Sequence, residues 1–418
     1  MPTHPAPRPA SLPDLRFLST VKNRLPVRLC LGVLLATCGV QGAGFKIDAG
    51  FPGGNIKVDR IEDDAVFLRA DLRDTVGAWF YWAFRVRGAA GCTLTFTFAT
   101  DQFSARGPAL STDGGVTWKW LGCEAVKARA FSHTFAAGAD DVRFSMGMPY
   151  TEANLNRFLR PHAGSTALIS ETLCETKKGR SVELLRFGKL DGEPRLRVFL
   201  SARHHACEMM ANYELEGIIE AVLANDGIGK WFRDNVELRA VPFVDKDGVE
   251  DGDQGKNRAP HDHNRDYAGE AIYPTVAAVK KMLPGWSGGK LKIALDLHCP
   301  GLRGGEHDVI HFVGGPETDL WARVTRLSAL LEEHSTTGPL RFRERDNLPF
   351  GKSWNKGPVD TPRSFASWAR TLPGVRIATT LELPYAMAGG REVNAETARA
   401  FGRTLAAALR AYLLADGE

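Results

Sequence analysis

The chain has 418 residues, of which 44% are hydrophobic, so it is long enough to bury more than one core and we expect two folded domains. Its formal net charge of +4 is small for this length and no run of five or more like charges occurs, which excludes a basic nucleic-acid-binding protein. Beyond residue 43, no stretch is apolar and long enough to predict a transmembrane helix.

Residues 1–43 differ in composition from the rest of the chain. Prolines recur over residues 2–13, and three basic residues then precede the apolar run 29–36, which is too short to span a bilayer. This pattern is typical of a leader with a secretory signal peptide, so we expect export to the periplasm. A lipid anchor at Cys38 is the less favoured alternative, because a threonine precedes this cysteine where glycine or alanine is usual.

Residues 44–155 are predicted to form an antiparallel β-sandwich domain. Apolar and polar side chains alternate over residues 93–98 and 131–135, and Asp113 opens a turn with two glycines. Five of the seven cysteines lie behind the leader, and this odd number leaves at least one without an intramolecular partner. Cys92 and Cys123 both lie in the β-rich region, so they are candidates for a disulfide in an oxidising periplasm.

The sharpest chemical signal lies at the end of a predicted strand, residues 196–200. His205 and Glu208 follow this strand, and the helical spacing of apolar residues over 215–223 places them at a strand-to-helix turn. His298 ends a second apolar strand, so imidazole, carboxylate and imidazole together have the composition of a catalytic zinc site. We predict one zinc ion per chain, the alternative being a solvated loop with a capping glutamate. His204 is also spaced to share a helical face with Glu208.

A polar segment, residues 257–267, lies between the two ligand segments. Asn264 and Arg265 are adjacent in it, and a forked guanidinium beside an amide suits bidentate recognition of a carboxylate. We therefore predict that this pair binds the C-terminus of a peptide. His261 and His263 belong to the same segment, where orientation of Arg265 is favoured over metal binding.

The last chemical group is Glu382, which lies in a nearly continuous apolar strand over residues 375–383. Leucines on both sides would partly desolvate this carboxylate, as suits a general base. Helical patterns precede and follow the strand, over residues 320–331 and 394–414. Neither a G-x-S-x-G motif nor an H-E-x-x-H motif competes with this interpretation.

The order of these motifs, H-x-x-E, then Arg258, then N-R, D-L-H and T-L-E-L, resembles the zinc carboxypeptidases, and the upstream β-rich region resembles that of their cytosolic branch. The resemblance implies an α/β catalytic domain with a mixed sheet over residues 156–418. It assigns His205, Glu208 and His298 as zinc ligands, Glu382 as general base and acid, Arg258 as oxyanion stabiliser, and Asn264 with Arg265 as the carboxylate clamp. A tyrosine that the family places about twenty residues before the catalytic glutamate is absent, and Tyr385 receives no catalytic role.

The implied activity is hydrolysis of the C-terminal residue of peptides or proteins. Two alternatives remain, a zinc-dependent amidase or deacylase of N-acyl amino acids, and a non-catalytic module that binds peptide or polysaccharide. Specificity for an acidic last residue would need a cation, and four lie ahead of Glu382, namely Lys352, Lys356, Arg363 and Arg370. A solvated basic loop is the alternative for these four. Cys207 and Cys299 each neighbour a ligand, where packing is favoured over metal binding.

Overall fold

The computed structural model describes residues 40–41, 44–357 and 362–415. By its internal contacts the chain divides between Ala36 and Thr37, and the first of these two units lies wholly outside the described residues, as do the signal peptide and Cys38. Among the described residues, no helix has the length and apolarity needed to cross a bilayer.

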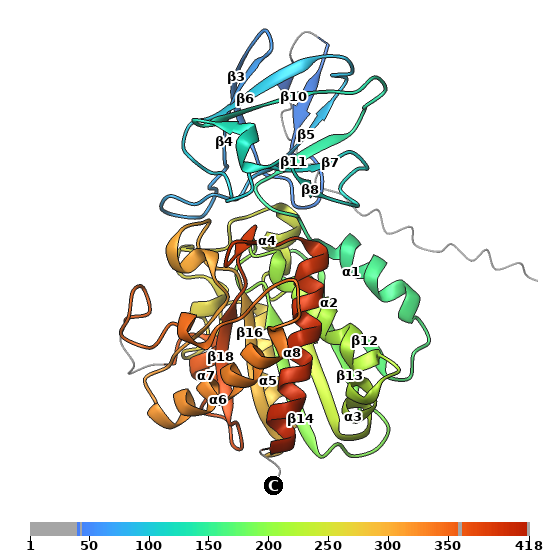
Figure 1. The fold of residues 1–418 in the computed structure, drawn as a ribbon, viewed down its shortest axis with the longest axis vertical. Coiled ribbons are helices and arrows are strands. Elements are labelled where there is room, and N and C mark those ends of the chain that lie inside the picture. The colour runs from blue at the N-terminus through green and yellow to red at the C-terminus, as the bar shows by residue number, and fades with distance from the viewer. Residues whose placement is uncertain (1–39, 42–43, 358–361, 416–418) are drawn as a thin grey trace, which may run out of the picture. The chain divides into compact units, whose positions relative to one another are not determined.

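The β-rich region consists of two sheets (Figure 1). The six-stranded sheet has the order β1 (Val40–Gln41), β2 (Lys46–Asp48), β5 (Ala83–Arg87), β11 (Val142–Ser145), β7 (Ala109–Ser111) and β8 (Lys119–Trp120). The five-stranded sheet has the order β3 (Lys57–Glu62), β4 (Ala65–Arg69), β6 (Thr93–Phe98), β10 (Ala130–Thr134) and β9 (Val126–Lys127). We call the part of the chain that forms these sheets the β-domain.

Aromatic side chains fill the space between the two sheets. Phe84 of the first sheet lies 5.2 Å from Phe96 of the second, and Phe144 lies 5.2 Å from Phe131, measured between ring centroids. The strict alternation of buried and less buried residues in β6 explains this arrangement, because alternate side chains of a strand point to one face. The pairing of β4 with β6 is parallel, so the expectation of purely antiparallel sheets is wrong at this pair.

The second group of strands forms one seven-stranded sheet, with the order β12 (Leu168–Glu175), β13 (Ser181–Gly188), β15 (Val236–Val241), β14 (Leu196–Ala202), β16 (Leu291–His298), β18 (Ile377–Glu382) and β17 (His311–Val313). Strands β15, β14, β16 and β18 run parallel, whereas β12, β13 and β17 pair antiparallel, so the sheet is mixed as predicted. The central strands are buried on both faces, which explains their continuous apolar sequence.

Helices cover both faces of this sheet. They are α1 (Glu152–Leu159), α2 (Met210–Leu223), α3 (Gly227–Asn235), α4 (Lys246–Asp251), α5 (Pro274–Ser287), α6 (Thr318–Ser335), α7 (Phe365–Ala369) and α8 (Ala395–Ala415). Val198 and Leu200 of β14 belong to the core that includes α2, α6 and α8, whereas Phe199 belongs to the core beneath α5 and α7. Neighbouring residues of one strand thus serve opposite faces, and the helices predicted near residues 215–223, 320–331 and 394–414 are confirmed.

The remaining short elements are the 3-10 helices η1 (Cys123–Ala125), η2 (Arg160–His162), η3 (His263–Arg265), η4 (Gly305–Asp308) and η5 (Glu344–Asp346), and the hairpin of β19 (Met387–Ala388) with β20 (Arg391–Glu392).

The disulfide considered between Cys92 and Cys123 is not formed, because both cysteines are free and exposed. Cys92 directly precedes the first residue of β6, whereas Cys123 belongs to η1, which leads into β9, and β10 lies between β6 and β9 in the sheet. Two strand spacings, about 9–10 Å, thus separate β9 from β6, which exceeds the short span that a disulfide can bridge.

Candidate active site

The predicted functional residues meet at the carboxyl ends of three adjacent parallel strands. His205 and Glu208 lie in the loop from β14 to α2, and His298 and Glu382 are the last residues of β16 and β18. The register of the sheet pairs His298 directly with Glu382. Parallel strands end at one edge of a sheet, so residues far apart in the sequence are brought together there.

The loop that carries His205 and Glu208 is shaped by Arg203, which has a positive φ of 62° and turns the chain after β14. The buried guanidinium of Arg203 donates hydrogen bonds to the carbonyl oxygen of Ala206 at 3.0 Å and to Oδ1 of Asn212, in α2, at 2.7 Å. These bonds tie the loop to the first turn of the helix. The first turn of α2 is not capped by any side chain, so Glu208 is not a capping residue.

Three side chains converge as the zinc prediction requires. Nδ1 of His205 lies 2.9 Å from Oε1 of Glu208, and Nδ1 of His298 lies 2.7 Å from Oε2 of the same carboxylate. The ligand atoms of all three residues lie within 4.8 Å of one another. Burial opposes the charge of Glu208, but Lys256 and the two histidines outweigh it and hold the pKa of this carboxyl well below its ordinary value, so it is ionised as a ligand must be.

The second nitrogen of each histidine faces another carboxylate. Nε2 of His298 lies 2.6 Å from Oδ2 of Asp296, and Nε2 of His205 lies 3.7 Å from Oδ1 of Asp262. A carboxylate behind a histidine fixes its ring and raises its basicity, which is the usual support of a metal ligand. The donor set therefore fits a zinc ion. Asp296 lies two residues before His298, so the two side chains point to the same face of β16. This spacing in the sequence could have identified Asp296 as the partner of His298.

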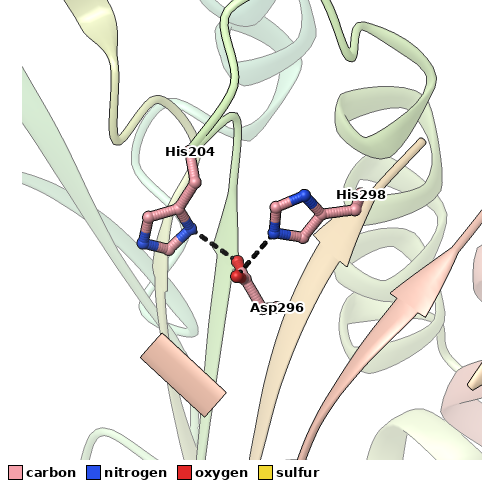
Figure 2. A group of neighbouring side chains, drawn as sticks. All are labelled: His204, Asp296 and His298. Atoms are coloured by element: carbon pink, nitrogen blue, oxygen red, sulfur yellow. Dashed lines mark hydrogen bonds and ion pairs between the residues drawn. The ribbon is translucent and has the colours of Figure 1, made fainter. Parts of the chain in front are cut away.

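A second group, His204 with Asp296 and His298, also has the composition of a metal site (Figure 2). Nδ1 of His204 lies 2.7 Å from Oδ1 of Asp296, and its Nε2 lies 2.8 Å from the hydroxyl of Tyr267, so both nitrogens already have partners. All three side chains of the group are buried. This cluster leaves no coordination position open to water, and its arrangement is that of an orienting network around Asp296.

Glu382 borders a cavity of about 1060 Å³ that His205 and His298 also line. Only 6% of this residue is exposed, and Oε2 of its carboxylate has no hydrogen-bond partner. An oxygen with a free lone pair beside the ligand cluster is placed to accept a proton from a water molecule.

Asn264 and Arg265 line the same cavity and belong to η3. Oδ1 of Asn264 accepts a hydrogen bond from the backbone N–H of Phe365 at 2.9 Å, which fixes the orientation of the amide. The Arg265 side chain is exposed, and its Nη1 donates to the carbonyl oxygen of Asn264 at 3.0 Å. Both side chains are thus available to a carboxylate that enters the cavity.

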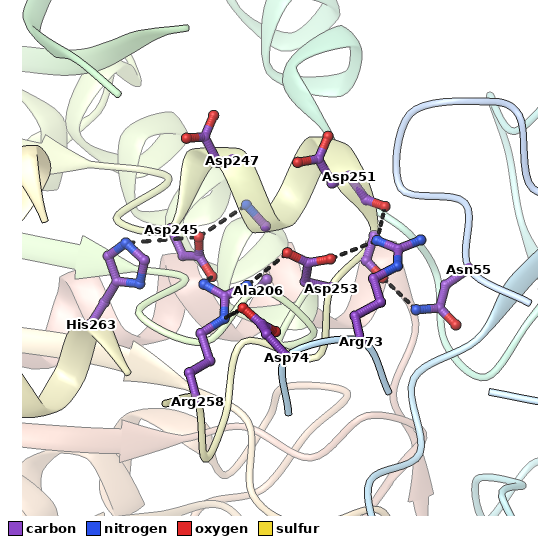
Figure 3. Close-up of polar contacts among 12 residues, drawn as sticks. Asn55, Arg73, Asp74, Ala206, Asp245, Asp247, Asp251, Asp253, Arg258 and His263 are labelled. Carbon is purple, nitrogen blue, oxygen red and sulfur yellow. Dashed lines mark hydrogen bonds and ion pairs between the residues drawn. The ribbon is translucent and has the colours of Figure 1, made fainter. Parts of the chain in front are cut away.

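Arg258, the predicted oxyanion stabiliser, is not among the described residues that line this cavity. Figure 3 shows its guanidinium among three carboxylates, with 2.6 Å from Nη1 to Asp245, 2.8 Å from Nη2 to Asp253 and 3.1 Å from Nε to Asp74. Arg258 is 8% exposed and does not belong to the described residues that line the cavity, although its neighbour Lys256 does. Nη1 and Nη2 donate hydrogen bonds to Asp245 and Asp253, whereas an oxyanion stabiliser would need these donors free, and Nε has no hydrogen-bond partner.

Tyr385 and the two buried cysteines pack beneath the ligand loop. The Tyr385 hydroxyl lies 3.6 Å from Sγ of Cys207, and its ring contacts Phe80 edge to face. Within the described part of the chain, neither Cys207 nor Cys299 belongs to a group that could hold a metal ion, as the packing interpretation predicted.

Comparisons with known proteins find similar sequences and structures, although no family model matches the chain. An uncharacterised protein of Zymomonas mobilis is 25% identical over 231 residues, covering 53% of this chain and 59% of that protein. Cytosolic carboxypeptidase 6 of Caenorhabditis elegans is 24% identical over 294 residues (62% and 63%), and human cytosolic carboxypeptidase 1 is 25% identical over 170 residues (37% and 14%). The chain thus spans less than two thirds of each of these curated relatives.

Solved structures resemble a larger part of the chain. A metallo-carboxypeptidase of Burkholderia cenocepacia has a TM-score of 0.71 at 21% identity, covering 90% of this chain and all of that one. A metallo-carboxypeptidase of Pseudomonas aeruginosa, solved with (2-guanidinoethylmercapto)succinic acid, has a TM-score of 0.70 at 20% identity, covering 88% and 99%. In sequence this chain is similar to cytosolic carboxypeptidases, and in fold it is similar to metallo-carboxypeptidases.

Proposed function

We propose that the protein is a zinc-dependent carboxypeptidase that removes the C-terminal residue of peptides or proteins. The observation that supports this most is the convergence of His205, Glu208 and His298, two of which line one cavity with Glu382 and the Asn264 and Arg265 pair. One zinc ion, held by the first three residues, would polarise the scissile carbonyl group and acidify a bound water molecule. Glu382 takes the proton of this water and passes it to the leaving amine, so no covalent intermediate is needed.

We also infer that the β-domain corresponds to the β-sandwich of the cytosolic carboxypeptidase branch, with residues 44–155 as one domain and residues 156–418 as the catalytic one. Export to the periplasm remains part of the proposal, since it rests on the leader sequence alone.

The carboxylate clamp is tested by Arg265→Ala with one peptide in two forms, with a free and with an amidated C-terminus. We expect KM for the free peptide to rise about tenfold or more and the slow turnover of the amidated peptide to change little, because only the free form offers a carboxylate for bidentate pairing. Arg345→Ala, at an arginine whose side chain is 73% exposed, is the matched control. Equal effects of Arg265→Ala on both forms would refute the clamp, and hydrolysis of N-acyl amino acids without peptide cleavage would favour the amidase alternative.

A preference for acidic last residues is the finer part of the proposal. Of the four cations predicted for this role, Lys356, Arg363 and Arg370 line the cavity and Lys352 does not. The Arg370 side chain is only 11% exposed, and its Nε donates to the carbonyl oxygen of Ala378 at 3.0 Å. Ala378 precedes Glu382 by four residues, or about 13 Å along β18. Nη1 of Arg370 also lies 3.3 Å from Oε2 of Glu317, which is a long ion pair, and the Glu317 carboxylate is half exposed. A substrate carboxylate can therefore compete with Glu317 for the Arg370 guanidinium.

We therefore expect kcat/KM for peptides ending in Glu to exceed that for the same peptides ending in Leu by about tenfold or more, and Arg370→Met to abolish this difference. A matched series that differs only in the last residue measures it. Lys352→Met is the control, since Lys352 does not line the cavity. If the wild-type protein cleaved peptides ending in Leu or Phe faster than those ending in Glu, the preference for acidic last residues would be refuted. The carboxypeptidase proposal would stay intact.

A further inference from the structure

The segment 254–258 connects α4 to the clamp residues, and contacts at both of its ends hold it in place. At its start, the Gln254 amide makes two hydrogen bonds with the backbone of Tyr81 in the β-domain, one of 2.7 Å and one of 2.8 Å. At its end, Arg258 is bound by Asp245 and Asp253 of the catalytic domain and by Asp74 from the β-domain. Five contacts of this kind fix the backbone on either side of Lys256.

The segment also lies against the ligand loop. A Cβ atom on Gly255 would lie 2.1 Å from the backbone nitrogen of Ala206, so only glycine permits this approach, and the positive φ of 78° at Gly255 favours glycine as well. Lys256 is therefore carried directly beside the residues that would hold the zinc ion.

The Lys256 side chain extends into the cavity. Its Nζ lies 2.6 Å from Oε1 of Glu208 and 5.2 Å from the centre of the Trp79 ring, which also lines the cavity. The side chain is 14% exposed.

An ammonium group in this place can donate to the ligand carboxylate, to the Glu382 carboxylate that lines the same cavity, or to a substrate oxygen that enters it. A divalent cation held by Glu208 would repel the ammonium at such a short distance, because the two charges have the same sign. Lysine has a flexible stem with three donors, and the Trp79 face beside it favours a cation. With Glu208 occupied by the metal and Glu382 acting on the water molecule, the carbonyl oxygen of a bound substrate is an acceptor that this ammonium group can serve.

We propose that Lys256, rather than Arg258, donates a hydrogen bond to the oxygen of the scissile carbonyl group as negative charge develops on it, and that Arg258 holds the segment that presents Lys256. This inference rests on the proposed carboxypeptidase function. It explains why three carboxylates surround Arg258, the cation that the family resemblance assigns to the oxyanion, while an unassigned lysine lies in the cavity.

The test compares Lys256→Met, Arg258→Gln and the double variant in the full-length, zinc-loaded protein, with Lys230→Met on α3 as the control, since its side chain is 72% exposed. We expect Lys256→Met to lower kcat about 100-fold with KM changed less than about threefold, as for the loss of one oxyanion donor. Zinc affinity, measured on metal-stripped protein with a competing chelator, should stay equal or increase, because a cation beside Glu208 has been removed. A merely structural lysine would instead lower zinc affinity and the melting temperature.

The double variant separates the roles of the two cations. If Arg258 acts through Lys256, Arg258→Gln should lower kcat in the unchanged background and have almost no further effect on kcat in the Lys256→Met background. Normal kcat in Lys256→Met, together with a 100-fold loss in Arg258→Gln, would overturn the inference and return the oxyanion role to Arg258. A zinc-loaded, unchanged protein that hydrolyses no peptide would overturn the proposed function itself, which is a distinct result.

Discussion

Replacing Glu382 by glutamine should lower kcat by a factor of about 100 or more while leaving the zinc content and the melting temperature unchanged. Glutamine keeps the shape of the side chain but cannot accept the proton of the attacking water, and general acid–base catalysis contributes about 10²–10⁴-fold to such reactions. The substitution breaks no hydrogen bond at Oε2 of Glu382, since this oxygen has no hydrogen-bond partner in the protein. Steady-state kinetics on a free C-terminal peptide, with zinc quantified in the same samples, measure the effect.

The control for this variant is Glu193→Gln, because the Glu193 side chain is 67% exposed and pairs with Lys290, ahead of the first residue of β16 and thus at the opposite end of the strands from Glu382. Its turnover should equal that of the unchanged protein. Near-normal kcat in Glu382→Gln would remove Glu382 from the mechanism, whereas loss of zinc in this variant would mean that the glutamate supports the ligand cluster and not the chemistry.

Replacing Glu208 by alanine should remove most of the bound zinc. Both oxygens of this carboxylate face a histidine, so the substitution leaves His205 and His298 without the ligand between them, and two imidazoles alone bind zinc weakly. Metal analysis of the purified protein, followed by chelator competition, measures the loss. Asp296→Asn is the graded comparison, and it should weaken zinc binding by about 10–100-fold, because Asp296 orients His298 from behind without being a ligand.

An undiminished zinc content in Glu208→Ala would contradict the ligand assignment. If Asp296→Asn lost zinc completely while Glu208→Ala retained it, the buried group of His204, Asp296 and His298 would be the metal site instead. The two variants together therefore distinguish the two candidate groups.

Local pattern was sufficient to predict the parts of this protein that lie within one strand or one helix. The apolar runs that became β14, β16 and β18 were recognisable because central parallel strands are buried on both faces. His205, Glu208, His298 and Glu382 could be assigned to one site because each follows or ends such a strand, and the carboxyl ends of parallel strands share one edge.

The helices α2, α6 and α8 followed from the helical periodicity, and the mixed catalytic sheet followed from the family resemblance. The parallel pairing of β4 with β6 did not, because either direction of pairing fits the alternation of a single strand. The separation of Cys92 from Cys123 was equally hidden, since it depends on β10 lying between β6 and β9 in the sheet.

Amino-acid order alone thus determined which residue types stand at the ends of which strands, and through them the zinc ligands and the general base that we propose. Only the tertiary structure decided which cation of the segment 254–258 lies in the cavity. Lys256 and Arg258 are two residues apart, and their directions depend on the close approach of Gly255 to Ala206 and on Asp74, which comes from the β-domain. Contacts of this kind cannot be predicted from a repeating pattern in the sequence. An ion pair between two distant segments does not require any particular residue spacing within either segment.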